Sequence, residues 1–147
     1  SDDPKEMKKI IDPIINEGYD FVLGARTKRF RDKHSMTVHQ IFGNWLACLL
    51  MKIFFNSTYK DLGPFRAIAW DKLMQLNMRD KTFGWTIEMQ IKALMKNYKY
   101  KEIDVKYKKR LGKSKISGTL KGSILAGKKI LYLIFKYYFK KKIGLLW

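Results

Sequence analysis

The spacing of apolar and polar residues along the 147-residue chain predicts alternating helices and short strands. The segment "DDPKEMKKIIDPIINEG" places two aspartates before Pro4 and ends in a glycine, which is typical of a helix with a start and a stop. The apolar run "YDFVLGAR" (19–26) then predicts a buried strand. A basic loop (27–35) leads to a long helix (36–56) that is apolar on most faces. Such a helix is either deeply buried or lies against a membrane.

The remaining pattern predicts, in chain order, a turn and short strand within 61–70, helices over 70–77 and 84–97, an alternating strand over 98–110, and a helix from about 119 to 142. The alternation over 98–110 slips once, near Glu102. Helices closely joined to strands indicate an α/β layer architecture. Only three strand candidates occur, so the expected sheet is incomplete.

Charge changes this picture, because the chain carries a net +18 that is spread unevenly. Residues 1–24 have a net charge of −3, residues 25–95 of +7, and residues 96–147 of +14. A gradient this steep indicates that one end faces an anionic partner, either a nucleic acid or a membrane surface.

Several chemistries are not supported by the sequence. The single cysteine, Cys48, lies in an apolar run, so no disulfide or cysteine-rich metal site can form. His34 and His39 do not share a helical face and have no acidic cluster beside them, which argues against zinc. No Ser/His/Asp arrangement is evident. The longest apolar run (41–55) is interrupted by Lys52 and is shorter than an ordinary spanning helix of about 20 residues.

The loop "RLGKSKISGT" (110–119) has the residue types of a phosphate site. Lysine, arginine and hydroxyl side chains donate charge-assisted hydrogen bonds, and a helix that starts at Thr119 offers free backbone N–H groups. A solvated basic linker with a helix cap explains the loop equally well. The basic helix that follows fits an anionic lipid surface, a nucleic acid, or a core position with lysines reaching to solvent.

Individual polar residues elsewhere give weaker indications. Arg26 closes a predicted strand, where α/β folds usually bind ligands. Asp61 and Arg66 lie around the tight turn of "DLGPFRA", which on its own indicates a structural turn with Arg66 exposed. Glu88 lies among apolar residues, where a solvated helix face or a paired structural carboxylate is the ordinary interpretation.

Five stretches taken together resemble a known family. "SDDPKEM", "DFVLGAR", "DLGPFRAI", "MRDKTFGWTIEMQIKA" and "RLGKSKISGT" occur in the order and spacing found in the second half of family 2 glycosyltransferases of the polyprenyl-phosphate type. The resemblance extends from Ser1 to about Lys129. It implies a GT-A fold, an α/β sandwich with a mostly parallel, Rossmann-like sheet. Residues 1–118 would form the acceptor-side half, and 119–147 a basic amphipathic helix and tail.

The resemblance also implies roles for single residues. Asp61 and Glu88 are the expected catalytic residues. The expected phosphate- and substrate-binding residues are Arg26, Gly63, Arg66, Trp85, Arg110, Ser114 and Lys115. The family binds Mg²⁺ or Mn²⁺ through a DxD motif that would precede this chain, so Ser1 is the one candidate metal contact here.

The implied reaction transfers a sugar from an NDP-sugar to a polyprenyl (dolichyl or undecaprenyl) phosphate by a metal-dependent single displacement. The isolated chain is expected to be incomplete and inactive. Its expected location is cytoplasmic and peripheral at an anionic membrane surface, reached through helices 36–56 and 119–142. The alternative is a non-catalytic basic module that binds a membrane surface or nucleic acid. Nucleic acid is disfavoured, because the chain has neither an RNP1 nor a zinc-finger pattern.

Overall fold

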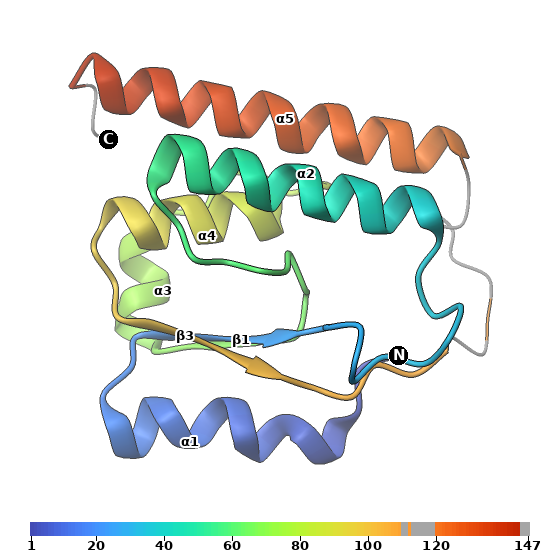
Figure 1. The fold of residues 1–147 in the computed structure, drawn as a ribbon. Helices are drawn as coiled ribbons and strands as arrows, with labels where there is room; N and C mark the ends of the chain where they lie inside the picture. Colours follow the sequence, from blue (N-terminus) through green and yellow to red (C-terminus); the bar gives the residue numbers. More distant parts are fainter. Residues whose placement is uncertain (110–111, 113–119, 145–147) are drawn as a thin grey trace.

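The computed structural model describes residues 1–109, 112 and 120–144 as a small α/β fold (Figure 1). Within these residues the helices are η1 (Pro4–Glu6, a 3-10 turn), α1 (Met7–Glu17), α2 (Val38–Phe55), α3 (Trp70–Leu76), α4 (Trp85–Met95) and α5 (Leu120–Lys142). The strands are β1 (Phe21–Ala25), β2 (Arg66–Ile68) and β3 (Tyr100–Asp104). The order and type of the predicted elements are therefore confirmed.

The three strands form one mixed sheet in the order β2-β1-β3. β1 pairs with β3 in parallel and with β2 antiparallel, so the sheet is not mostly parallel as expected. The loop after α2 brings the chain to the end of the sheet where β1 finishes. β2 starts at that end and runs in the direction opposite to β1. This register places Leu23 of β1 between Arg66 and Glu102, which brings two charged residues to the same end of the sheet.

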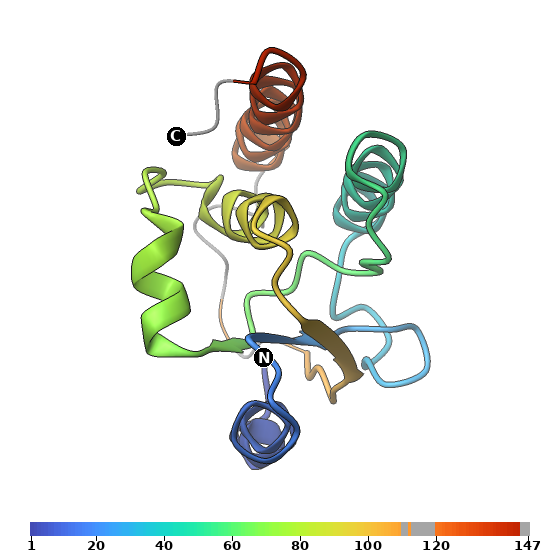
Figure 2. The same ribbon diagram turned by 90° about the vertical axis from the view of Figure 1, so that its left-hand side faces the viewer.

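The helices cover both faces of the sheet. Figures 1 and 2 show α1 alone on one face, with α2, α4 and α5 on the other. The main core lies between β1 and these three helices, and a smaller cluster around Ile10, Val22 and Val105 lies beneath α1. β1 is buried along its whole length, as its unbroken apolar run predicts.

Local chemistry explains where the helices begin and end. The Asp3 side chain accepts a hydrogen bond from the Lys5 amide, and Gly18 ends α1 in the left-handed conformation, with φ of 67°. Thr37 and Gln40 form a reciprocal capping box at the start of α2. β3 is shorter than the expected strand 98–110, because its partner β1 ends at Ala25 and leaves no ladder to continue.

Helices α2 and α5 are each only partly buried. α2 buries Ala47, Cys48, Met51 and Phe55, and its other faces are largely exposed. At 18 residues, α2 is long and apolar enough to cross a membrane by length and composition alone, a test that core helices also pass. α5 packs on α2 and α4 through a narrow buried stripe, Leu133, Ile134 and Tyr137.

Candidate functional site

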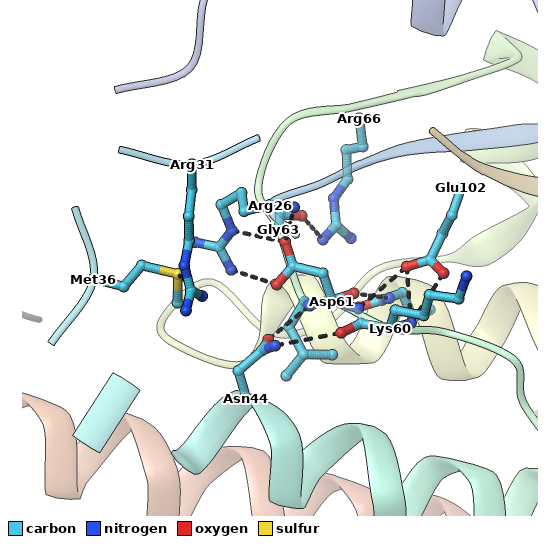
Figure 3. A network of polar contacts seen from close by, with 11 residues as sticks. Arg26, Arg31, Met36, Asn44, Lys60, Asp61, Gly63, Arg66 and Glu102 are labelled. Carbon is cyan, nitrogen blue, oxygen red and sulfur yellow. Dashed lines mark hydrogen bonds and ion pairs between the residues drawn. The ribbon is translucent and has the colours of Figure 1, made fainter. Parts of the chain in front are cut away.

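The centre of the candidate site is an ion pair between Arg26 and Asp61 at the carboxyl end of β1 (Figure 3). The Arg26 Nε and Nη2 atoms each donate to one Asp61 carboxylate oxygen at 2.7 Å, and the Arg26 amide donates at 2.8 Å. The side chains are 13% and 5% exposed. Burial alone would lower the pKa of Arg26, but the hydrogen bonds and charge of Asp61 raise that pKa above its ordinary value. Arg26 therefore stays charged in spite of its burial.

Arg66 lies on the other side of Gly63 from Arg26 (Figure 3). It donates to the carbonyl oxygens of Gly63 and Thr86, and its guanidinium lies 5.0 Å from the Trp85 ring centroid. Its Nε is buried without a partner, and it forms no ion pair with any described residue. Burial lowers its pKa to about 10, so the residue remains a cation at neutral pH.

Gly63 is required by close packing between these two arginines. A Cβ atom there would lie 2.7 Å from the Gly24 carbonyl oxygen and 2.9 Å from an Asp61 carboxylate oxygen, closer than real Cβ contacts. A larger residue at this position would displace Asp61 from Arg26. The structure brings together five residues that the motifs single out: Arg26, Asp61, Gly63, Arg66 and Trp85.

A cavity of about 400 Å³ opens between α2 and α5 above this pair. Arg26 and Tyr107 line it from the side of the sheet, where the Arg26 guanidinium lies 5.3 Å from the Tyr107 ring centroid. The α5 wall is mainly small or apolar, with Ala126, Gly127, Ile130 and Leu131 beside Ser123. The α2 wall is mixed, with Gly43, Leu46 and Ala47 beside His39, Gln40 and Asn44. The cavity thus places the Arg26–Asp61 pair beside a partly apolar enclosure.

Glu88 lies apart from this group, in a buried network between α4 and α5. Its carboxylate accepts hydrogen bonds from the Tyr137 hydroxyl (2.6 Å), Lys92 Nζ and the Asp80 amide (2.7 Å). Burial raises the pKa of Glu88, but these hydrogen bonds outweigh burial and leave it below its ordinary value. The residue does not line the cavity, and its catalytic role stays a prediction.

The N-terminus lies beside the same site. The Ser1 carbonyl accepts from the Lys108 amide at 2.8 Å, and Asp2 forms an isolated bridge with Tyr107. Burial raises the pKa of Asp2, whose Oδ1 atom is buried without a partner. Across the described ranges, no group of three His, Cys, Asp or Glu side chains is placed to hold a metal ion. The expected phosphate contacts in the loop, Arg110, Ser114 and Lys115, lie outside the described residues.

Sequence reasoning missed three residues that shape this site. Glu102 on β3 accepts from the Lys60 amide at 3.0 and 2.9 Å and from the Asp61 amide at 3.2 Å. Asn44 on α2 accepts from the Leu62 amide, and Gln90 on α4 donates to the Asp61 carbonyl. The sequence offers one signal for Glu102, the break in the alternating pattern of 98–110. The break puts a charged residue on the face of the strand that otherwise carries apolar residues.

Comparison with known proteins gives a partial match. The chain is 37% identical over 67 residues to uncharacterized glycosyltransferases of Mycobacterium bovis and Mycobacterium tuberculosis. The match covers 45% of this chain and 31% of each relative, so it spans less than a third of the relatives' length. No family model and no solved structure matches. The chain therefore has distant, partial similarity to glycosyltransferases.

Proposed function

We propose that this chain is the acceptor-side portion of a family 2 glycosyltransferase of GT-A fold, which transfers a sugar from an NDP-sugar to a polyprenyl phosphate. The cavity beside Arg26 carries the proposal. A polyprenyl phosphate needs positive charge around its head and an apolar enclosure for its first isoprene units. The cavity has a mainly apolar lining and the guanidinium of Arg26, whose charge Asp61 already balances, so further cations must help to bind the head. The partial similarity to glycosyltransferases supports the reaction class.

The proposed chemistry needs cations more than it needs a strong general base. A phosphate monoester has a second pKa of about 6, so it is nucleophilic near neutral pH without losing a further proton. Its oxygen attacks the anomeric carbon as the bond from that carbon to the nucleoside diphosphate breaks. The site must then hold several negative charges together, which is the task of fixed cations. Arg66 has an unpartnered Nε–H and no carboxylate partner in the described structure, so no ion pair balances its charge. It lies behind the cavity wall, where it donates to the carbonyl oxygen of the lining residue Thr86. Arg110, Ser114 and Lys115 complete the proposed clamp.

The resemblance also implies Mg²⁺ or Mn²⁺, and the described residues do not make a complete site for it. Asp2 is the one carboxylate near Arg26 with an unpartnered oxygen, and Ser1 adds a single hydroxyl. A divalent ion of this kind requires more oxygen ligands. The principal ligands would have to come from outside the described residues.

Glycine substitutions in the cavity test acceptor binding without touching the cations. Gly127 on α5 lines the cavity, and nothing lies within 4 Å of a Cβ added there. Gly127→Leu should therefore fold at least as stably as the parent, since glycine within a helix costs roughly 1 kcal/mol. We expect it to weaken binding of farnesyl phosphate about tenfold or more, measured by calorimetry. Gly127→Ala is the control for size and should bind nearly normally. Equal binding by both variants would place the isoprenoid elsewhere.

Catalysis needs a separate test. Protein that includes the coding sequence upstream of Ser1 would be incubated with undecaprenyl phosphate and a panel of labelled NDP-sugars. Label in the lipid fraction, lost in Arg66→Ala, supports the transferase. Absence of transfer with every sugar, while vesicle binding persists, favours the non-catalytic membrane module.

The proposal includes peripheral docking on the anionic cytoplasmic leaflet. α2 exposes large apolar residues, among them Val38 (84%), Phe42 and Trp45 (57%), and α5 beside it exposes Phe135 and Phe139 near three terminal lysines. An apolar row beside lysines fits an anionic bilayer. Figure 1 shows both helices on the side away from α1.

Vesicle cosedimentation tests this docking. Trp45→Ser should reduce binding to phosphatidylglycerol vesicles. Trp70→Ser is a matched control, because Trp70 is 73% exposed but lies on α3. Failure of the parent chain to bind at low salt, or equal losses in both variants, would contradict docking through α2.

A further inference from the structure

The irregular segment 60–62 is held in place by side chains from three separate elements. Glu102 on β3 accepts from the amides of Lys60 and Asp61, Gln90 on α4 donates to the Asp61 carbonyl at 3.0 Å, and Asn44 on α2 accepts from the Leu62 amide at 2.9 Å. Figure 3 shows Glu102 and Asn44 approaching the segment from different directions. In a strand or helix, backbone N–H and C=O groups bond to other backbone groups. In this segment they bond to side chains instead.

This support decides where the Asp61 carboxylate points. Asp61 reaches Arg26 with both carboxylate oxygens, a geometry that tolerates little rotation of the peptide that carries it. Glu102 is the only carboxylate among these three supporting side chains. It accepts hydrogen bonds from two consecutive amides, those of Lys60 and Asp61. Loss of that contact would free the peptide just before Asp61 and loosen the pair at the cavity.

We propose that Glu102 is a positioning residue, which holds the Lys60–Asp61 peptide so that Asp61 fixes Arg26 at the wall of the cavity. Its importance for acceptor binding rests on the proposed function, whereas its hold on the peptide does not. A deprotonated carboxylate accepts hydrogen bonds through both oxygens. In a protonated carboxyl group one oxygen carries a hydrogen, which would face the amide N–H groups and weaken their hydrogen bonds. The support is therefore strong when Glu102 is ionised and weak when it is protonated.

The surroundings of Glu102 make this change accessible near neutral pH. Burial raises its pKa to about 7, against the lowering effect of the two amides. The charged or titratable groups that influence or are influenced by it are Lys60 and Asp61 from the loop, Tyr59 before them, and Cys48 on α2. Of these, the Asp61 charge adds to the rise and the Lys60 charge opposes it.

Amide NMR on this chain tests the positioning directly. The ¹H shifts of the Lys60 and Asp61 amides should titrate together with a midpoint near 7, because both donate to Glu102. Glu102→Gln should abolish that titration, and Glu17→Gln, at an exposed carboxylate on α1, should leave it intact. Flat amide shifts in the parent, or the same titration in Glu102→Gln, would overturn the proposal. The parent titration decides the matter even where a variant fails to fold.

A binding measurement adds the functional consequence. Glu102→Gln should weaken farnesyl phosphate binding about tenfold at pH 8. Ionisation of the phosphate itself raises affinity between pH 6 and pH 8 in parent and variant alike, and the parent should show an additional rise that the variant lacks. A purely structural role would lower affinity equally at every pH, and that result would overturn the proposal. Amide titration with no farnesyl phosphate binding at any pH would confirm the positioning and contradict the proposed function instead.

Discussion

Removal of the Asp61 carboxylate should be among the most destabilising changes in this chain. In Asp61→Ala, Arg26 would keep its charge in a site where its side chain is only 13% exposed, with both Nε and Nη2 left without their acceptor. Breaking a buried pair by deleting one partner costs about 3–5 kcal/mol, because an uncompensated charge stays behind. The equilibrium constant for unfolding should then rise more than about a hundredfold.

Urea unfolding followed by circular dichroism measures this loss. The control is Asp12→Ala, which removes the partner of Lys8 in an exposed pair on α1, with side chains 40% and 81% exposed. That pair should contribute less than about 1 kcal/mol. If Asp61→Ala lowers the free energy of unfolding no more than Asp12→Ala, the reasoning from burial is refuted. Arg26→Met added to Asp61→Ala should recover part of the loss, since no buried charge then remains.

Three further predictions concern the packing and the pH dependence of the fold. Gly84→Ala should lower the melting temperature, with a cost of about 1–3 kcal/mol, because its Cβ would overlap with Leu133 Cδ1; an unchanged melting temperature would contradict this. Tyr137→Phe removes the 2.6 Å hydrogen bond to Glu88 and should cost about 1.5–3 kcal/mol in urea unfolding, whereas a cost near zero would show that the network is not stabilising. The pKa of Glu102 is about 7 in the fold, above its ordinary value, so protonation favours the folded state and its contribution is lost as pH rises from about 5 to above 7. The free energy of unfolding of the parent should fall over that range relative to Glu102→Gln, and parallel pH profiles would contradict the assignment.

The elements of the fold were predictable because their signals are local. An aspartate before Pro4 and a glycine at 18 mark the ends of the first helix, and an unbroken apolar run marks β1. Capping and burial patterns depend on neighbours only a few residues away, so the sequence displays them directly. The antiparallel direction of β2 was not predictable, since no local pattern records which end of β1 the returning chain meets.

The sequence by itself determined the helices, the buried strand, the basic gradient and the motif residues Arg26, Asp61, Gly63 and Arg66 as candidates. Only the tertiary structure decided their partners. Arg26 and Asp61 are 35 residues apart, and Asp61 and Glu102 are 41 apart, so each pair exists only because β1, β3 and the loop before β2 meet at one end of the sheet. The same packing places Glu88 in a buried network with Tyr137 of α5, away from the cavity. A backbone group in an irregular segment has no partner assured by a helix or a strand ladder, so segment 60–62 depends on side chains that the tertiary fold brings to it.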